Sequence, residues 1–323
     1  MTLFISEAQV SELVGPKGAI AAVHAAHLDI SQGKVDNVVR SRARSPQMSL
    51  HTLAATSTTL GYGAAKVYSA NRDNVRSLVL LYQLQTGKLS AIIEAKNLGK
   101  MRTAAASILS AQLMLGDLPS SIALIGTGFQ AWGIAESIAA NKTSGMEPEV
   151  FVYSRSHEQR EKFAEQAHVE LGLKIAPAKS AEEAVSQGEL LITATTASSP
   201  VFEKEWIKNT KHIAALGSNA LSRQEIPPQT ISGASLLFVD CLETARKEAG
   251  NLLKALENGK IFWSQVHEFS NIVANPVHYQ ELVRDGYSVF SSQGLAAQDL
   301  YLAHTVYLRA VNGEPNVLPF FDN

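Results

Sequence analysis

The sequence is poor in the features that assign a protein to a specialised class. One cysteine, Cys241, occurs among 323 residues, so no disulfide can form within the chain. No apolar run approaches the roughly 18 residues that a membrane helix needs. No long run of lysine and arginine occurs, and the formal net charge is −2. These absences argue against a disulfide scaffold, a membrane protein and a nucleic-acid-binding protein.

The amino end also lacks the pattern of a secretory signal, because the acidic residue Glu7 occurs too early. We therefore expect a soluble cytoplasmic protein. The histidines His24 and His27 lie at helical spacing, but no cysteine, aspartate or glutamate at ligand spacing supports them. We expect them to be packed or half-exposed helix residues, and we expect no metal site.

The residues that are present suggest two domains by length, with an ordinary apolar content of 46%. Residues 6–9 are typical of a capping box before a short helix, and Pro16 starts a second helix. Strand-like segments follow in residues 38–95, including a hairpin, and residues 101–115 predict an Ala-rich helix.

From residue 117 onward, apolar strands alternate with helical patterns. This alternation predicts an α/β fold built on a doubly wound parallel sheet. The expected strands are residues 121–125, 149–154, 190–193, 212–216 and 236–239, and the later helices are 157–171, 181–186 and 298–311. We expect the last helix to return and pack on the N-terminal domain.

The most specific motif is the turn Gly126-Thr127-Gly128-Phe129-Gln130-Ala131, which joins an apolar strand to a helical pattern. The first glycine allows the tight turn, the second lets the backbone approach a pyrophosphate, and the alanine lets helix pack on strand. The helix N-terminus offers N–H groups and the positive dipole end to the anion. The motif therefore predicts a nicotinamide dinucleotide site.

The end of the next strand indicates which nicotinamide cofactor is preferred. An NAD site usually carries an acidic residue near this point, but here Arg155 stands between Ser154 and Ser156. A guanidinium can pair with a 2′-phosphate, so the sequence favours NADP(H), with NAD(H) possible; the alternative is that Arg155 is a solvated surface residue. Thr195 and Thr196 close a later strand, where small hydroxyl residues line such a crevice or simply end a strand.

These blocks together resemble the ornithine cyclodeaminase/mu-crystallin family nearly end to end. Six short blocks in the family's order carry the resemblance: residues 61–67, 101–107, 126–131, 194–201 with Trp206, 217–219 with 223–226, and 289–294 with Asp299. The resemblance implies a Rossmann-type NAD(P)-binding domain over residues 117–298. It also implies an α+β domain, residues 1–116 with 299–323, that binds substrate and makes a homodimer.

The family's substrates carry a carboxylate beside an amine or imine, and the resemblance places Arg40 and Arg102 at its two carboxylate-binding positions. A guanidinium fork can bind two oxygens at once. Arg42 and Arg44 alternate onto the same strand face as Arg40, and we expect them to be solvated or salt-bridged. Lys66 would hydrogen-bond the carboxylate and supply or orient a proton at nitrogen, helped by partial desolvation.

Asn219 is a departure from the family pattern. Cyclodeaminases of the family have an aspartate there, and a neutral amide cannot act as a base at pH 7. Asn219 can still hold a substrate by hydrogen bonds, so we count it with Lys66 and Arg102 as a candidate catalytic residue. The departure disfavours ornithine cyclodeamination and favours hydride transfer to or from a C=N bond.

The resemblance also extends the expected cofactor contacts beyond the glycine turn. Asp299 is expected either near the nicotinamide or only as a helix-start carboxylate, and Glu225 and Asp240 are expected to be structural. The full set is Thr103, Gly126, Thr127, Gly128, Phe129, Gln130, Ala131, Ser154, Arg155, Ser156, Thr195, Thr196, Ser292, Gly294 and Asp299.

The favoured function is NAD(P)H-dependent reduction of Δ1-pyrroline-2-carboxylate or Δ1-piperideine-2-carboxylate to proline or pipecolate. The alternatives are an alanine-type or N-alkyl amino-acid dehydrogenase, then ornithine cyclodeaminase, then a non-enzymatic, NADP-dependent, crystallin-like binder. Family resemblance gives the cofactor and substrate class rather than the reaction.

Overall fold

The computed structural model describes residues 2–71, 74–142, 147–313 and 317–318, and the chain forms two compact units. Unit 1 comprises Met1–Arg102 with Leu295–Asn323, and unit 2 comprises Thr103–Gly294. The expected boundaries lay after residues 116 and 298. The units divide earlier at both places, after Arg102 and after Gly294. Helix α3 (Lys96–Leu115) runs through the first expected boundary, and most of that helix groups with unit 2. The substrate-binding and dimerisation role of unit 1 stays a prediction.

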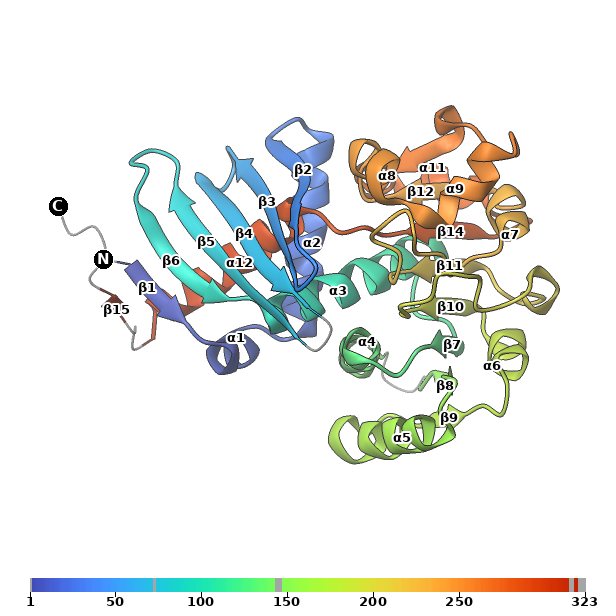
Figure 1. The fold of residues 1–323 in the computed structure, drawn as a ribbon. Coiled ribbons are helices and arrows are strands. Elements are labelled where there is room, and N and C mark those ends of the chain that lie inside the picture. Colours follow the sequence, from blue (N-terminus) through green and yellow to red (C-terminus); the bar gives the residue numbers. More distant parts are fainter. Residues whose placement is uncertain (1, 72–73, 143–146, 314–316, 319–323) are drawn as a thin grey trace. The chain divides into compact units, whose positions relative to one another are not determined.

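Unit 1 is an α+β unit built on a sheet with the strand order β15-β1-β6-β5-β4-β3-β2. Helices α2 and α12 pack on one another, and α12 also packs on β2 to β5 (Figure 1). The last helix therefore returns to the N-terminal strands, as predicted. The elements are β1 (Thr2–Ile5), α1 (Glu7–Leu13), α2 (Pro16–Ser31), β2 (Val35–Arg44), β3 (Ser49–Ser57), β4 (Tyr62–Ala70), β5 (Val75–Gln83), β6 (Leu89–Glu94), α12 (Ala296–Val311) and β15 (Val317–Leu318).

Local signals in the sequence set the ends of these elements. The Ser6 side chain accepts from the backbone N–H of Gln9, and the Gln9 side chain accepts from the backbone N–H of Ser6, so the predicted capping box is confirmed. Pro16 occupies the first turn of α2, where its missing N–H costs no helix hydrogen bond.

A bulge in β2 places Arg40 on the inner face of the sheet. The pairing with β3 shifts by one residue between Val38 and Ser41, so the successive residues Val39 and Arg40 are both buried. A regular strand would have turned one of the two outward. Arg40 therefore shares a face with Lys66 on β4, which pairs with Leu53 opposite the bulge.

Unit 2 contains eight parallel strands in the order β13-β12-β14-β11-β10-β7-β8-β9. Helices α4 and α5 lie on one face of this sheet and α6 and α7 on the other (Figure 1), which confirms the doubly wound fold. The strands are β7 (Ser121–Ile125), β8 (Glu149–Tyr153), β9 (Ile175–Pro177), β10 (Leu190–Thr193), β11 (His212–Ala215), β12 (Leu236–Val239), β13 (Val266–Glu268) and β14 (Ser288–Ser291). The helices are α4 (Phe129–Asn141), α5 (His157–Leu171), α6 (Ala181–Gln187), α7 (Pro228–Ser232), α8 (Leu242–Glu248), α9 (Gly250–Glu257), α10 (Phe269–Ala274) and α11 (Pro276–Leu282).

The strand order reverses between β7 and β10, because the chain runs outward from β7 to β9 and then returns to the other side of β7 at β10. Loops that leave the carboxyl ends of two such strands diverge and leave a crevice, which is where ligands bind in open α/β sheets. The glycine turn follows β7 directly. The fold thus places the predicted cofactor motif at the reversal.

Candidate active site

The first glycine of the turn is required by the backbone. Gly126 has a φ of +122°, and a Cβ there would lie 2.5 Å from the Ala194 carbonyl oxygen. The Gly126 N–H donates to the Tyr153 carbonyl at 2.8 Å. The ends of β8 and β10 therefore hold the turn from both sides. A side chain at Gly126 would push the turn away from the Ala194 carbonyl.

The second glycine of the turn, Gly128, borders open space at the N-terminus of α4. Gly128 is the N-cap residue of α4, and a Cβ there would meet no atom within 4 Å. Ala131, one turn into the helix, is completely buried. An open approach to the first N–H groups of a helix is the arrangement that a pyrophosphate requires. These residues fit a dinucleotide.

A pocket of about 890 Å³ lies over the carboxyl ends of β7, β8 and β10. Eight predicted cofactor residues line it: Gly126, Thr127, Gly128, Ser154, Arg155, Ser156, Thr195 and Thr196. Sequence reasoning missed Tyr153 and Gln159, which also line it, and the wall formed by residues 197–201. The pocket is of the size that small-molecule and cofactor sites have.

The loop after β8 is held from behind by a residue that sequence reasoning also missed. Arg160 is buried, donates to the Ser154 carbonyl, and lies 4.9 Å from the centroid of the Tyr153 ring. The Ser156 hydroxyl caps α5 by accepting from the Gln159 N–H at 3.3 Å. Arg155 itself is exposed, so its guanidinium is accessible to an anion.

A buried carboxylate supports the pocket wall that follows β10 without lining the pocket itself. Glu225 accepts hydrogen bonds from the Thr195 N–H, the Thr195 hydroxyl and the Gly217 N–H. Burial raises the pKa of Glu225, and the donors from Thr195 and Gly217 oppose that rise. Glu225 thus joins the loop after β10 to the loop after β11.

The remaining predicted cofactor residues do not line this pocket. Phe129, Gln130 and Ala131 form the first turn of α4, and Thr103 is buried in α3. Ser292 and Gly294 follow β14, where the Asp240 carboxylate accepts from the N–H groups of Gln293 and Gly294 at 2.6 and 2.9 Å. Their contacts with a cofactor stay predictions.

Unit 1 brings together the predicted substrate residues around a carboxylate. The Lys66 ammonium donates to Asp299 Oδ1 at 2.7 Å, and Arg102 Nε lies 3.6 Å from the same oxygen. Lys66 is only 6% exposed. Gly99, one turn before Arg102 on α3, leaves room for the ammonium, because a Cβ there would lie 3.1 Å from Lys66 Nζ.

Asp299 lies in the first turn of α12, and its carboxylate is directed to Lys66 and Arg102. The sequence left open a helix-start role and a role near the nicotinamide. The ion pair with Lys66 was not expected, because the two residues are 233 positions apart. A contact between Asp299 and a nicotinamide stays a prediction.

Burial lowers the pKa of Lys66 below its ordinary value of 10.5. Asp299 opposes this change by attraction and hydrogen bonding, whereas the positive charges of Arg102 and Arg40 lower the pKa further. Lys66 is therefore a buried amine whose proton is held by one carboxylate and repelled by two guanidinium groups. Such an amine is suited to proton transfer.

A chain of polar contacts extends from Arg102 into the interior of unit 1. Arg102 Nη1 lies 3.5 Å from Gln298 Oε1, and Gln298 Nε2 lies 3.0 Å from His27 Nε2. His27 is completely buried, which agrees with the expectation of a packed helix histidine. No group of three potential metal-ligating side chains occurs among the residues that the structure describes.

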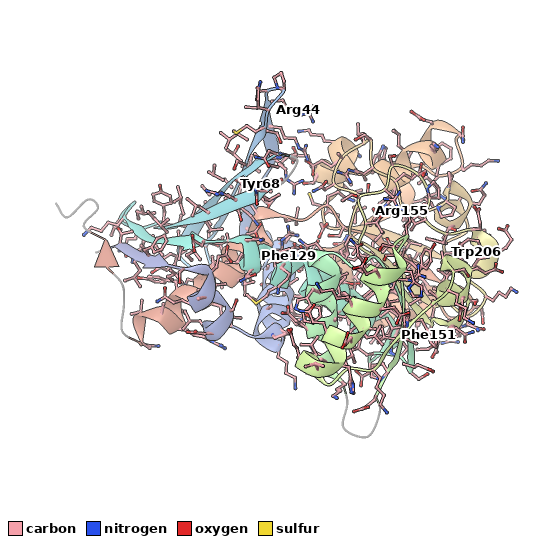
Figure 2. All side chains as sticks on the ribbon, turned by 60° about the horizontal axis from the view of Figure 1, so that its bottom comes forward. Arg44, Tyr68, Phe129, Phe151, Arg155 and Trp206 are labelled. Atoms are coloured by element: carbon pink, nitrogen blue, oxygen red, sulfur yellow. The ribbon has the colours of Figure 1, made fainter. Side chains whose placement is uncertain are left out.

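Two further arginines, Arg42 and Arg44, follow Arg40 along β2. Arg42 is half-buried and Arg44 is exposed at the tip of β2 (Figure 2). The neighbouring His51 stacks on Tyr68 with 4.3 Å between ring centroids. Burial, followed by Arg42, Arg40 and Arg44, lowers the pKa of His51 to about 4, so His51 is neutral at pH 7.

Asn219 lies exposed in the loop after β11, two residues beyond Gly217. The neighbouring Ser218 hydroxyl donates to the Arg223 carbonyl at 2.8 Å and closes this loop. The catalytic assignment of Asn219 stays a prediction.

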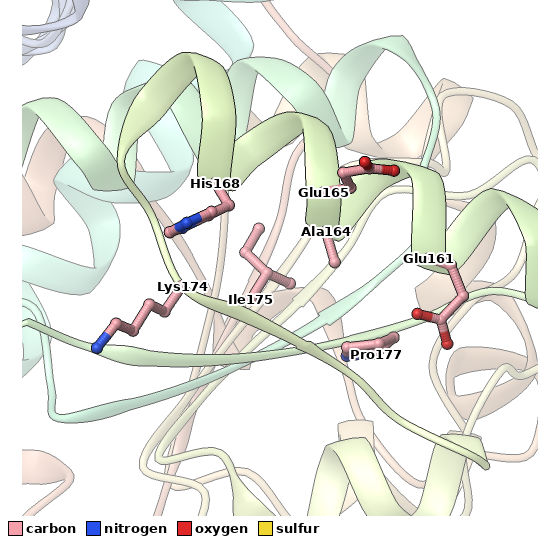
Figure 3. Close-up of a pocket in the computed structure, with 7 residues that line it drawn as sticks. All are labelled: Glu161, Ala164, Glu165, His168, Lys174, Ile175 and Pro177. Carbon is pink, nitrogen blue, oxygen red and sulfur yellow. The ribbon is translucent and has the colours of Figure 1, made fainter.

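A second pocket, of about 490 Å³, lies between α5 and the edge strand β9 (Figure 3). Its polar lining consists of Glu161, Glu165 and His168 from α5 and Lys174 before β9. It contains none of the predicted site residues, and we assign no function to it.

The fold and the pocket define a two-unit protein with a Rossmann-type dinucleotide site. The chain belongs to the ornithine cyclodeaminase/mu-crystallin family, whose model matches residues 1–314. The resemblance inferred from six short blocks is thereby confirmed. No described helix combines the length and apolarity needed to cross a membrane.

Known members of the family are similar over most of their length. A Δ1-pyrroline-2-carboxylate reductase from Bacillus cereus (strain ATCC 10987 / NRS 248) is 32% identical over 241 residues, 74% of this chain and 73% of the relative. The structure of the Thermococcus litoralis Δ1-pyrroline-2-carboxylate reductase with NADH and L-proline has a TM-score of 0.87 and 26% identity, covering 98% and 99% of the two chains. An archaeal alanine dehydrogenase dimer with bound NAD has a TM-score of 0.85 and 26% identity over 99% of both chains.

The two glycines of the turn should respond differently to alanine. Gly126→Ala introduces both a strained φ and a clash with the Ala194 carbonyl, and we expect a loss of stability of about 2 kcal/mol or more. Gly128→Ala meets no protein atom, so stability should stay within about 0.5 kcal/mol while NADH affinity falls at least tenfold. Denaturant unfolding and NADH fluorescence titration measure the two effects. Wild-type NADH affinity in Gly128→Ala would contradict the pyrophosphate assignment.

Proposed function

We propose that this protein is an NAD(P)H-dependent reductase of cyclic imino acids, converting Δ1-pyrroline-2-carboxylate or Δ1-piperideine-2-carboxylate to proline or pipecolate. The observation that carries the proposal is the buried cluster of Lys66 and Arg102 around Asp299, in a chain that also has a dinucleotide pocket. The similarity to Δ1-pyrroline-2-carboxylate reductases supports the same reaction.

The substrate carboxylate would be held by Arg102, Arg40 and Lys66. Arg40 on β2 and Lys66 on β4 lie on one face of the sheet with β3 between them. Arg102 and Lys66 both contact the carboxylate of Asp299. Charge-assisted hydrogen bonds from a guanidinium to a carboxylate are strong and directional. Holding the acid in this way fixes the adjacent C=N carbon, which is the main contribution a protein makes to hydride transfer.

Lys66 would supply the proton that the imine nitrogen requires. A bound reduced nicotinamide supplies the hydride to the imine carbon. Asp299 keeps the ammonium of Lys66 protonated and oriented, and the two arginines make its proton easier to release. Asn219 could hold the substrate through its amide, but an amide offers no base for the ring closure of ornithine.

NADPH is the cofactor that we propose the protein prefers. Arg155 and the capped N-terminus of α5 stand in the pocket at the end of β8, where an NAD site usually carries an acidic residue. The similar structures with NADH and NAD support a nicotinamide cofactor without deciding between the two forms.

A homodimer and a cytoplasmic location complete the proposal. Unit 1 carries apolar residues on the sheet face opposite Lys66: Val38, Leu50 and Leu78 are 54%, 38% and 41% exposed. Their positions alternate with the buried residues of β2, β3 and β5. An exposed apolar face of this kind is suited to a second copy of the chain.

A substrate screen tests the reaction directly. Purified protein should oxidise NADPH in the presence of either cyclic imine, and turnover should be at least 100-fold lower with pyruvate plus ammonia or methylamine. Absorbance at 340 nm and amino-acid analysis of the product measure this. Turnover with pyruvate and an amine alone would favour the dehydrogenase alternative, and conversion of ornithine to proline with ammonia would show that Asn219 has been misinterpreted.

Removal of the Lys66 amine should affect chemistry more than cofactor binding. We expect Lys66→Met to lower kcat with the imine at least 100-fold, with NADPH affinity changed less than twofold. Because the pKa of Lys66 is lowered, the rate of the unaltered enzyme should fall with rising pH below 10.5, and this decline should disappear in the variant. Lys88→Met, in the exposed β5–β6 turn, is the matched control. Full turnover by Lys66→Met would remove the proton role.

The cofactor preference depends on Arg155. Arg155→Ala should weaken NADPH at least tenfold and NADH less than twofold, because only the 2′-phosphate loses a charged partner. Fluorescence titration with each cofactor measures both constants, and Arg246→Ala on α8 serves as the control. An equal loss for the two cofactors would contradict the phosphate assignment.

A further inference from the structure

Glu225 is a buried residue whose two carboxylate oxygens bind two different loops, the one after β10 and the one after β11. Its Oε1 accepts from the Thr195 N–H at 2.7 Å and from the Thr195 hydroxyl at 2.8 Å, and its Oε2 accepts from the Gly217 N–H at 2.7 Å. The side chain is completely buried. Three short hydrogen bonds in the interior make a rigid connection.

The Thr195 side of this connection forms part of the pocket wall. The Thr195 hydroxyl accepts from the Ala197 N–H at 3.2 Å, so its own proton is directed to Glu225. Thr195 and its neighbours line the dinucleotide pocket. The preceding carbonyl, that of Ala194, is the group that restricts Gly126. Glu225 therefore fixes the strand end against which the glycine turn rests.

The Gly217 side leads to the loop that carries Asn219. A Cβ at Gly217 would lie 2.0 Å from the Thr195 carbonyl oxygen and 2.6 Å from Glu225 Oε1. The two loops are thus in direct backbone contact at Glu225. The Glu225 backbone is fixed in turn, because its N–H donates to Asn251 Oδ1 on α9 at 2.7 Å.

We propose that Glu225 is a positioning residue that couples the dinucleotide pocket to the Asn219 loop. Binding of the dinucleotide against Thr195 would then order residues 217–219 through the shared carboxylate. The inference rests on the proposed nicotinamide cofactor, but it does not depend on which imine is reduced. Groups held by a supporting shell of buried hydrogen bonds are the ones that keep a site's geometry.

Glutamine cannot replace this carboxylate. Glu225 accepts at both oxygens, whereas a glutamine side chain has one acceptor oxygen and an NH₂ that only donates. In Glu225→Gln, the NH₂ must therefore face either the N–H of Gly217 or the donors of Thr195. Thr195 supplies two donors and Gly217 one, so the amide oxygen keeps more hydrogen bonds when it faces Thr195 and the NH₂ faces Gly217. The loop of residues 216–223 is then released, although the shape and volume of the side chain are nearly unchanged.

Two measurements on Glu225→Gln test the coupling. NADPH and NADH dissociation constants, measured by fluorescence, should rise at least tenfold. In hydrogen exchange, saturating cofactor should protect residues 126–131 and 216–223 in the unaltered protein. In the variant, protection of 126–131 should persist and that of 216–223 should be lost. A purely structural residue would not separate the two segments.

Matched variants keep the test decisive. Glu189→Gln is the control, because Glu189 accepts from the Ser120 hydroxyl at 3.0 Å and precedes β10, at the opposite end of that strand from Thr195. It should leave both measurements unchanged. Thr195→Val removes the hydroxyl contacts with Glu225 and with the Ala197 N–H but keeps the two backbone N–H contacts to Glu225. It should therefore reproduce the loss of protection more weakly, and it is the test variant if Glu225→Gln does not fold.

Unaltered cofactor affinity together with intact protection of residues 216–223 in these variants would overturn the coupling. Absence of any cofactor binding by the unaltered protein would overturn the proposed function as well, so the two failures are distinguishable.

Discussion

The buried pair between Lys66 and Asp299 is the interaction on which the chemistry of unit 1 depends. Two charges removed from water are costly unless their geometry is good and further partners satisfy them. Here the ammonium lies 2.7 Å from the carboxylate, and Arg102 approaches the same oxygen. Asp299 belongs to α12, so the carboxylate reaches Lys66 only because the last helix returns to the N-terminal sheet. Folding of unit 1 and assembly of its cationic cluster are therefore one event.

The corresponding constraint in unit 2 is the reversal of strand order at β7 and β10. The glycine turn follows β7, and the loop held by Glu225 follows β10. Because Gly126 lies against Ala194, the two loops form the pocket as one packed arrangement. The turn at Gly126, the loop with Arg155 and the wall at Thr195 line one pocket because parallel strands end at one edge of the sheet.

The sequence predicted best those features that are local. The turn from Gly126 to Ala131 and the cap at Ser6 each need only a few consecutive residues, and both have the expected conformation. Strands β9 and β13, with three residues each, are too short for a periodic pattern. β14 was noted only as a family block. Its burial on all four residues removes the alternation that marks a half-buried strand.

Contacts between residues far apart in the chain could not be predicted from the sequence, for a physical reason. The pairing of Lys66 with Asp299 joins residues 233 positions apart, and no periodicity encodes such a contact. Arg40 was identified by resemblance, but its burial depends on a bulge that a pattern of alternation cannot reveal. Arg160, Gln159 and Tyr153 take their roles from the loop after β8, whose conformation follows from the fold.

The candidate residues are supported in two ways, most of them by a sheet and Asn219 by an exposed loop. Lys66 lies within a strand, and Gly126 and Thr195 lie directly against strand ends, where the sheet determines their positions. Asn219, which the family resemblance marks as a departure from the cyclodeaminases, lies on an exposed loop held by the Ser218–Arg223 hydrogen bond and by the contact of Gly217 with Glu225. A change of reaction can therefore occur by substitution on that loop without disturbing the sheet. The carboxylate of Glu225 would keep the loop that carries the new side chain in a fixed position relative to the dinucleotide. A reaction between substrate and cofactor requires such a fixed position more strictly than binding alone does.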